Sequence, residues 1–220
     1  ILTVEDPVEY QLDGINQIQV KPQIGLHFGD ALRSIVRQDP DIIMIGEMRD
    51  LETAGIAVQS ALTGHLVFST LHTNDAGSSI TRLLDMGVED YLLTSTLNSI
   101  LSQRLVRTLC THCRRAYTPV PELIDELGLA RYAGREGLQL HEAVGCAQCM
   151  NTGYIGRSVI TEFLILSDSI RRLILTRADG TEIQRTAIAA GMDTMQTDGI
   201  RKAVRGITSV EEVMRVTQEI

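Results

Sequence analysis

Short apolar segments alternate with helical repeats through the first hundred residues. The apolar segments at residues 1–5, 42–45 and 65–71 predict buried strands, and residues 16–20, which alternate polar and apolar side chains, predict a half-exposed strand. Apolar residues at helical spacing predict helices near residues 28–36, 51–62, 76–86 and 91–105. Buried strands that alternate with helices are typical of a parallel sheet, so the pattern predicts an α/β fold.

The pattern changes at residue 109. From there to about residue 157 the chain holds two Cys-x-x-Cys pairs, several glycines and a short predicted helix at residues 119–129. From residue 159 onward the pattern predicts helices again, and Ser209 with Glu212 predicts a capping box for the last of them. These changes divide the chain into three predicted domains, residues 1–108, 109–157 and 158–220.

The composition agrees with a folded protein. Of the 220 residues 44% are hydrophobic and 22% are charged, which is enough apolar surface for one core with a small satellite domain. The net charge of −8 argues against a nucleic-acid partner, because such proteins are usually basic. No apolar stretch approaches the roughly 18 residues of a membrane span, and no signal peptide is visible. We therefore expect a cytoplasmic protein in a reducing compartment.

All four cysteines fall in two Cys-x-x-Cys pairs, Cys110 with Cys113 and Cys146 with Cys149. Each pair can form a knuckle that points two thiolates at one metal ion, and two knuckles complete the tetrahedral geometry of structural zinc. The 32 residues between the pairs exceed the spacing of ordinary zinc ribbons, so this loop must contain structure of its own. The alternatives are a redox Cys-x-x-Cys, which normally begins a helix, and coincidence. His112 is expected to be a bystander.

Polar side chains gather where the predicted strands end. Glu5, Asp6 and Glu9 follow the first strand, Glu47 follows the next buried strand, and His72 follows the one after it. Ligands of open α/β sheets bind at the carboxyl ends of the strands. A buried strand that aims a carboxylate at Mg²⁺ or at an attacking water is also what nucleotide hydrolysis needs. The alternative is a set of solvated turn residues, but convergence from three segments favours a site.

One histidine pair and one arginine pair need separate interpretation. His65 and His72 bracket one predicted strand and lie about 23 Å apart in extended chain, so only His72 belongs to the ligand edge. Arg33 and Arg37 stand at i and i+4 on one predicted helix face, where like charges repel by about 0.2–0.5 kcal/mol. A phosphate, or a carboxylate across a subunit interface, would offset this repulsion, and a solvated pair is the alternative.

Three segments and the cysteines occur together in the order of one family. Residues 1–10 (ILTVEDPVEY) resemble the Asp box, residues 37–50 (RQDPDIIMIGEMRD) the atypical Walker B, and residues 63–76 (TGHLVFSTLHTNDA) the His box of the type II secretion and type IV pilus assembly ATPases, the GspE/PilB family. Residues 110–149 resemble the zinc-binding subdomain of its assembly branch. The resemblance covers the whole chain and implies part of a RecA-like P-loop ATPase core, a zinc-binding subdomain and a helical carboxyl-terminal region.

The resemblance also implies roles for individual residues. Glu5 would polarise the attacking water, Glu47 would lie near Mg²⁺ and that water, and His72 would sense the γ-phosphate of ATP. The residues matched to further nucleotide or subunit contacts are Asp6, Glu9, Arg33, Arg37, Gly46, Thr70 and Arg157. Beyond Arg157 the chain departs from the family, because Val159 stands where a glycine is usual and a β-branched residue cannot take a left-handed turn.

Within the family, residues 10–17 and 84–87 resemble secretion ATPases more than pilus ATPases. The resemblance then implies a homo-hexameric motor that binds ATP, Mg²⁺ and Zn²⁺ at the cytoplasmic face of the bacterial inner membrane. Its implied partners are an inner-membrane platform protein and the cytoplasmic domain of a membrane anchor, and its implied work is pseudopilus assembly and protein export. A type IV pilus extension ATPase is the alternative.

Two functions from other classes remain as alternatives. One is a zinc-ribbon nucleic-acid module, which the acidic net charge disfavours, and the other is a non-catalytic interaction fragment.

The phosphate-binding loop of such enzymes is not in this sequence. No Gly-x-x-x-x-Gly-Lys-Ser/Thr motif occurs in the 220 residues, and the two lysines, Lys21 and Lys202, do not follow a glycine-rich loop. The chain also begins without methionine inside a predicted strand. We therefore expect a part of a longer protein that lacks the Walker A, and we expect these residues alone to be inactive.

Overall fold

The computed structural model describes residues 1–133 and 137–218. The chain forms two compact units. The first contains Ile1–Ile100 and Ile165–Ala187, and the second contains Leu101–Leu164 and Ile188–Ile220. The division at residues 108 and 157 stays a prediction. Among the described residues, no helix combines the length and the apolar character that a bilayer crossing needs.

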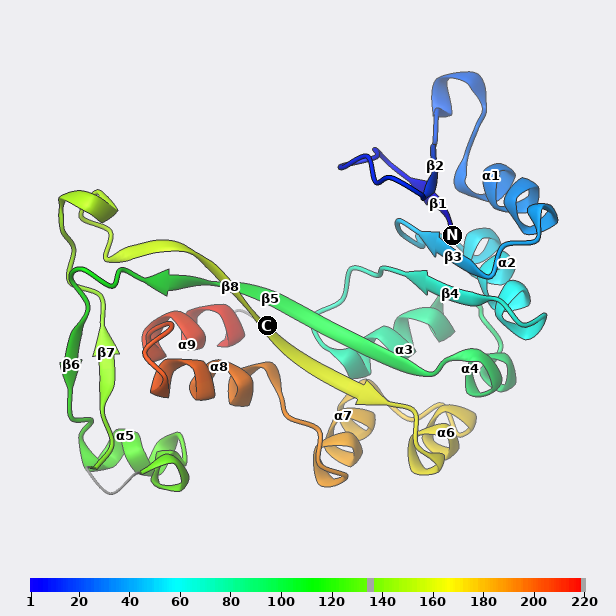
Figure 1. Ribbon diagram of the computed structural model, residues 1–220. Helices are drawn as coiled ribbons and strands as arrows, with labels where there is room; N and C mark the ends of the chain where they lie inside the picture. The colour runs from blue at the N-terminus through cyan, green and yellow to red at the C-terminus, as the bar shows by residue number, and fades with distance from the viewer. Residues whose placement is uncertain (134–136, 219–220) are drawn as a thin grey trace. The chain divides into compact units, whose positions relative to one another are not determined.

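The first unit is built on a four-stranded parallel sheet (Figure 1). Val4 lies opposite Ile18 on one side and Ile45 on the other, and Ile45 lies opposite Ser69. The strand order across the sheet is β2 (Asn16–Gln19), β1 (Leu2–Glu5), β3 (Ile42–Ile45) and β4 (Leu66–Ser69). This confirms the predicted α/β fold with its parallel sheet.

Six helices of the described chain belong to the first unit or reach into it. They are α1 (Phe28–Ile35), α2 (Leu51–Leu62), α3 (Ala76–Asp85), α4 (Asp90–Thr96), α6 (Asp168–Leu175) and α7 (Gly180–Ala189). The short turns η1 (Pro22–Ile24) and η2 (Val36–Gln38) flank α1. Asp50 and Asp75 cap α2 and α3, because their side chains accept the backbone N–H groups of Thr53 and Ser78 at 2.7 and 2.6 Å.

The core of the first unit holds the sheet in register. Ile43 and Ile45 of β3 are fully buried, and they cluster with Leu32 and Ile35 of α1 and with Ala57 of α2. Burying each large aliphatic side chain contributes about 1.5–3 kcal/mol. A slip of register by one residue would turn these buried side chains toward water. The packing therefore fixes the register of the sheet, and with it the positions of the strand ends.

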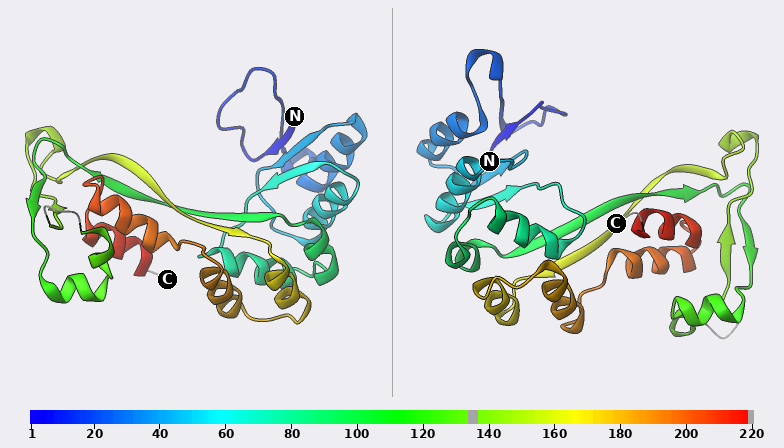
Figure 2. Two further views of the ribbon diagram at one scale, coloured as in Figure 1. Left: turned by 60° about the horizontal axis from the view of Figure 1, so that its bottom comes forward. Right: turned by 180° about the vertical axis from the view of Figure 1, so that it is seen from behind.

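The second unit contains two small sheets and the last helices. β5 (Ser99–Leu109) pairs with β8 (Tyr154–Ile165) as a long two-stranded ribbon, which both views of Figure 2 show. β6 (Arg115–Tyr117) pairs antiparallel with β7 (Leu140–Glu142). The other elements are α5 (Pro121–Glu126), η3 (Leu129–Tyr132), η4 (Ala147–Cys149), α8 (Met195–Val204) and α9 (Val210–Gln218). The long segment between the cysteine pairs therefore has structure of its own, as predicted.

A buried carboxylate links α9 to β5 inside the second unit. The Glu212 side chain is 0% exposed and accepts the Arg107 backbone N–H at 3.0 Å, Arg107 Nη2 at 2.7 Å and Arg215 Nε at 2.9 Å. Burial alone would raise the pKa of Glu212, but the hydrogen bonds from Arg215 and Arg107 lower it to about 2. The ionised form is therefore the native form.

Two secondary-structure predictions are wrong. The helix expected over residues 91–105 ends at Thr96 as α4, Leu97 is extended with φ −76° and ψ 124°, and the chain continues as β5. Helices were expected from residue 159 onward, but residues up to Ile165 belong to β8. Val159 lies within that strand, so the backbone there needs no left-handed turn and the departure from the family pattern introduces no strain.

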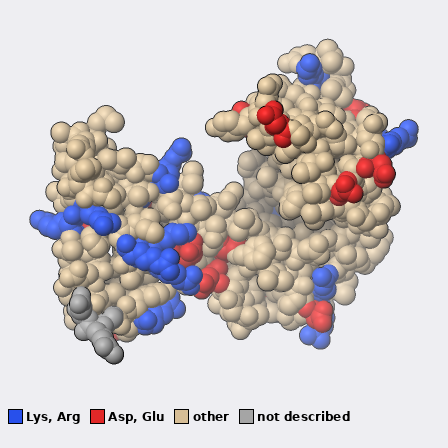
Figure 3. Space-filling model, in the orientation of Figure 1, with Lys and Arg blue, Asp and Glu red and all other residues tan. Residues whose placement is uncertain are grey.

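Charge is divided unevenly between the units. The first contains 17 Asp and Glu against 9 Lys and Arg, whereas the second contains 11 of each, so the net charge of −8 belongs to the first unit. On the face drawn in Figure 3, Lys and Arg gather over the second unit. An anionic ligand of the first unit would need a cation to accompany it.

Candidate functional site

Three strands of the first unit end side by side and bring their next residues together. β1 ends at Glu5, β3 is followed by Gly46 and Glu47, and β4 is followed by Thr70. The Gly46 N–H donates to Val4 O at 2.7 Å, the Thr70 hydroxyl donates to Gly46 O at 2.5 Å, and the Met48 N–H donates to Thr70 O at 3.1 Å. These bonds continue the sheet beyond its strands and fix the segment that holds Glu47.

Gly46 is required by the close approach of β1. A Cβ atom at this position would lie 3.2 Å from Val4 O and 3.3 Å from the Cα of Glu5, which is tighter than ordinary van der Waals contact. A larger residue would push the carboxyl ends of β1 and β3 apart. The glycine therefore sets the spacing between the two segments that hold Glu5 and Glu47.

The Glu47 carboxylate is held by two cationic or potentially cationic side chains. It is only 12% exposed, and its Oε2 lies 2.7 Å from Arg49 Nε and 3.5 Å from His72 Nε2. The hydrogen bond to Glu47 raises the pKa of Arg49 above its ordinary value. Arg49 and His72 are 71% and 86% exposed, so their charges are largely screened by water. Glu47 and His72 meet at one edge, as the sequence predicted.

The Glu5 carboxylate is held from its own sheet. Its Oε1 accepts the Thr3 hydroxyl at 2.5 Å and Gln17 Nε2 at 3.0 Å. Sequence reasoning missed both of these residues and Arg49. Gln17 stood out in the sequence only as a polar residue in a half-exposed strand. Its contact with Glu5 depends on the pairing of β2 with β1, which the sequence does not state.

A cavity of about 400 Å³ opens beside the Glu47 segment. The residues that line it are Asp6, Val20, Pro22, His27, Phe28, Gly29, Asp30, Glu47, Arg49, Asp50, Glu52 and Thr53. Five of these are carboxylates, so a polyanion could enter only together with cations. The cavity joins Asp6 and Glu47 in one space.

Other residues singled out in the sequence lie apart from this edge. Glu9 is exposed in the loop that follows β1. Arg33 forms ion pairs with Asp30 and Glu52 of the same unit, so its charge has partners within the chain. α1 ends at Ile35 and Arg37 follows in the 3₁₀ helix η2, so the two arginines do not share one α-helix. Arg157 is exposed on β8 in the second unit.

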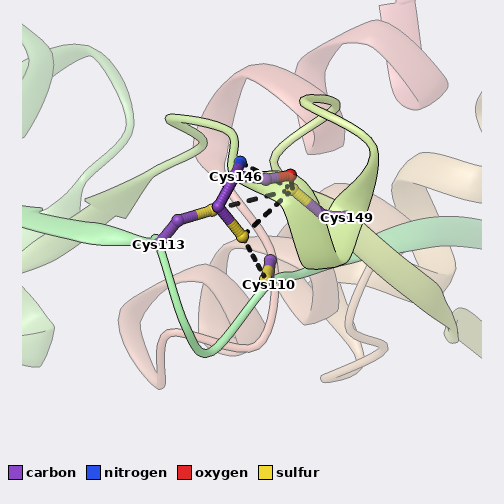
Figure 4. A group of neighbouring side chains, drawn as sticks. All are labelled: Cys110, Cys113, Cys146 and Cys149. Atoms are coloured by element: carbon purple, nitrogen blue, oxygen red, sulfur yellow. Dashed lines mark hydrogen bonds between the residues drawn. The ribbon is translucent and has the colours of Figure 1, made fainter.

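The four cysteines meet in the second unit (Figure 4). The Sγ atoms lie 3.9 Å apart for Cys110 and Cys146, and 3.8 Å apart for Cys113 and Cys149 and for Cys146 and Cys149. Four sulfurs at about 2.3 Å from a tetrahedral zinc ion lie about 3.8 Å from each other. A disulfide needs about 2.05 Å, so the thiols are free and spaced as metal ligands.

Backbone N–H groups surround these sulfurs. Cys149 Sγ accepts the N–H groups of Cys146 and Gly153 at 3.1 and 3.2 Å, and Cys113 Sγ accepts that of Gly145 at 3.3 Å. Burial alone would raise the pKa of the Cys149 thiol, but the N–H donors of Cys146 and Gly153, together with the neighbouring thiols, lower it to about 6. Burial raises the pKa of Cys113 to about 11, although the Gly145 N–H acts in the opposite direction. Donors of this kind favour the thiolate that a metal ion requires. Neither Cys-x-x-Cys begins an α-helix, which argues against a redox motif.

The sequence comparisons identify the family. The family model described as "Type II/IV secretion system protein" matches residues 1–215. The chain is 61% identical over 219 residues to "Type II secretion system protein E" of Xanthomonas campestris pv. campestris, covering 100% of this chain and 38% of that protein. It is 52% identical to "Type IV pilus assembly ATPase PilB" of Thermus thermophilus, covering 99% and 24%. The chain thus spans less than half the length of these curated relatives.

A solved structure supports the same assignment. The pilus retraction motor PilT with bound ADP matches at a TM-score of 0.69 and 30% identity, covering 100% of this chain and 54% of that one. The match extends over both units. Taken with the family model and the 61% relative, it leads to one conclusion: the chain belongs to the type II/IV secretion system protein family.

Proposed function

We propose that this chain forms the water-activating edge and the zinc module of an ATP-hydrolysing motor of a type II secretion system. The observation that carries the proposal is that Glu5, Glu47 and His72 lie at or just after the carboxyl ends of adjacent parallel strands, where Glu47 Oε2 is 3.5 Å from His72 Nε2. The three residues come from three separate segments of the chain. Polar side chains at this edge are explained by ligand binding, since ligands of open α/β sheets bind at the carboxyl ends of the strands. The relatives named as ATPases give the reaction class.

The proposed reaction is the hydrolysis of ATP to ADP and phosphate. Glu5 orients a water molecule and accepts its proton, the water oxygen bonds to the γ-phosphorus, and the bond to the bridging oxygen breaks. Glu47 supplies a carboxylate near Mg²⁺, which neutralises phosphate charge when bound. His72 senses the γ-phosphate through its proximity to Glu47. Asp6, Gly46 and Thr70 shape the same edge, and Glu9, Arg33, Arg37 and Arg157 are assigned to nucleotide or subunit contacts.

We assign Zn²⁺ to the four cysteines. The sulfur spacing and the N–H donors support a closed tetrahedral site with no open position, which is the form of a structural rather than a catalytic zinc ion. Such a site contributes folding energy to the segment that encloses it. The zinc would therefore stabilise the knuckles of the second unit and take no part in hydrolysis.

The motor is proposed to be a homo-hexamer at the cytoplasmic face of the bacterial inner membrane. Its partners would be a platform protein in that membrane and the cytoplasmic domain of a membrane anchor, and its work would be pseudopilus assembly and protein export. Nucleic acid is not among the proposed partners, because the net charge of −8 would repel it. The 52% identity to a pilus assembly ATPase favours one second candidate, a type IV pilus extension motor.

Two chimeras test the proposal. In one, these 220 residues replace the segment that they match in the Xanthomonas campestris relative, and in the other they replace that segment in the Thermus thermophilus relative. We expect the first to hydrolyse ATP and to restore protein secretion in a strain that lacks the native protein. If only the second chimera is functional and restores pili, the pilus extension motor is favoured. Full ATP hydrolysis by a Glu47→Gln version of either chimera would contradict both the secretion motor and the pilus motor.

A further inference from the structure

The side chain of Gln17 has a fixed orientation between β1 and the loop that follows it. Gln17 Oε1 accepts the Leu12 backbone N–H at 2.8 Å, and Gln17 Nε2 donates to Tyr10 O at 2.9 Å and to Glu5 Oε1 at 3.0 Å. Turning the amide over would place its oxygen against two acceptors and its NH₂ group against a donor. The contacts therefore permit only one arrangement of the amide.

The sheet register brings Gln17 to Glu5. β1 and β2 are parallel, with Thr3 opposite Gln17 and Glu5 opposite Gln19. In the part of the chain that the structure describes, the two side-chain donors to Glu5, Thr3 and Gln17, converge on Oε1. Oε2 is then the oxygen that a water molecule would use.

The loop between β1 and β2 depends on the same amide. Tyr10 is 80% exposed and Leu12 is 53% exposed, so their side chains add little burial that would hold the loop. Their backbone groups are instead bonded to Gln17. One side chain thus connects the position of this loop to the orientation of the Glu5 carboxylate.

We propose that Gln17 is a positioning residue for Glu5: it holds Oε1, directs Oε2 toward the attacking water, and couples the loop at residues 10–12 to hydrolysis. This inference rests on the proposed function. A movement of Tyr10 and Leu12, for instance on contact with a neighbouring molecule, would then change the rate of hydrolysis through Gln17. Gln17 itself touches neither nucleotide nor water in this proposal.

The test measures ATP turnover by the Xanthomonas campestris chimera. Gln17→Met keeps the length of the side chain and removes its three hydrogen bonds. We expect kcat to fall about 10- to 100-fold with KM for MgATP within about twofold, because positioning affects the reaction step and not nucleotide affinity. Asn16→Met, at the exposed neighbouring position of β2, is the matched control and should retain kcat within about twofold.

Gln17→Glu adds a pH readout that does not depend on a loss of packing. The introduced carboxyl can donate to Glu5 only while it is protonated, and once ionised it repels the Glu5 carboxylate. We expect its kcat, relative to the unsubstituted chimera, to fall steadily between about pH 5 and pH 8. The ionised carboxylate would also lose its hydrogen bond to Tyr10 O, so KM for MgATP is measured at each pH. An effect that acts through Glu5 should leave this KM within about twofold across the range.

The outcomes separate this inference from the proposed function. Unchanged kcat in Gln17→Met, or a pH-independent ratio for Gln17→Glu, would overturn the role of Gln17 while leaving the ATPase assignment intact. Full turnover by Glu47→Gln would overturn the proposed function whatever the Gln17 variants do.

Discussion

Glu47 Oε2 lies 3.5 Å from His72 Nε2, although α2 and the whole of β4 separate the two residues in the chain. The contact follows from the parallel pairing of β3 with β4, which places the residues after each strand at one edge. His65 begins the same segment, where its Nδ1 lies 2.9 Å from Ser60 O and 3.1 Å from the Thr63 hydroxyl. The two histidines are therefore at opposite ends of β4 and have different partners.

His72→Ala should lower kcat of the Xanthomonas campestris chimera about 100-fold, the cost of removing one group aimed at developing charge. His65→Ala is the control on the same strand. It should cost about 1 kcal/mol of stability through its lost hydrogen bonds and leave kcat within about twofold. Steady-state kinetics and denaturant unfolding distinguish the two. Equal losses of kcat in both variants would show that the integrity of β4, and not a group at the carboxyl edge of the sheet, determines the rate.

Gly46→Ala should reduce both activity and stability. Its new methyl group would meet Val4 O and the Cα of Glu5, so β1 and β3 must separate where the two carboxylates are held. We expect a loss of about 1–3 kcal/mol in the free energy of unfolding, together with a lower kcat. Gly55→Ala, in the middle of α2 with open space around it, should instead stabilise by about 0.5–1 kcal/mol. The same sign of stability change in both variants would contradict this account.

The sequence predicted these strand ends because their signals are local. An apolar run followed by a polar turn marks the end of β1, β3 and β4, and the neighbouring helices follow from their own spacing. The ribbon of β5 and β8 was missed because residues 97–105 place leucines at positions that suit a helix or a strand. The strand forms because this segment pairs with residues 154–165, which are distant in the sequence. The β-branched residues Val159, Ile160 and Thr161 in that segment were the local indication of a strand.

The site was predictable to the same extent. Glu5, Glu47 and His72 could be placed at one edge by topology alone, without any knowledge of side-chain contacts. Gln17 and Arg49 could not, because their roles depend on the register of β1 with β2 and on the conformation of the turn after Glu47. Arg33 also shows this limit, since its partner Glu52 comes from another helix.

The cysteine site should bind one zinc ion per chain. Elemental analysis of protein purified without chelator should give a ratio of about one, and Cys149→Ser should reduce it well below that value. His112→Ala is the control, because four sulfurs already fill a tetrahedral site, and it should retain zinc. Retention of zinc by Cys149→Ser together with its loss in His112→Ala would reverse the assignment.

Acid should remove the stability that Glu212 provides to the second unit. Its pKa of about 2 lies below the ordinary value of 4.5, so this stability is complete above about pH 4.5 and is lost as the pH falls toward 2. Glu212→Gln should therefore cost about 3 kcal/mol at pH 7 and less than half of that at pH 3. Loss of zinc in acid affects both proteins alike, so the difference between their unfolding curves isolates Glu212.

Glu211→Gln is the matched control for this effect. Glu211 is the exposed neighbour of Glu212 on α9, and its change should remain within about 0.5 kcal/mol at either pH. A cost for Glu212→Gln that is equally large at pH 3 and pH 7 would show that packing, and not the ion pairs with Arg107 and Arg215, is responsible.

The most direct test of the central claim is the rate of ATP hydrolysis by the Xanthomonas campestris chimera with and without Glu47→Gln. The substitution keeps the shape of the side chain and removes its charge, and both proteins are measured with MgATP after their folding and assembly are matched. The account predicts turnover by the unsubstituted chimera and a loss on the order of 100-fold or more in the variant. Equal rates in the two proteins would contradict it.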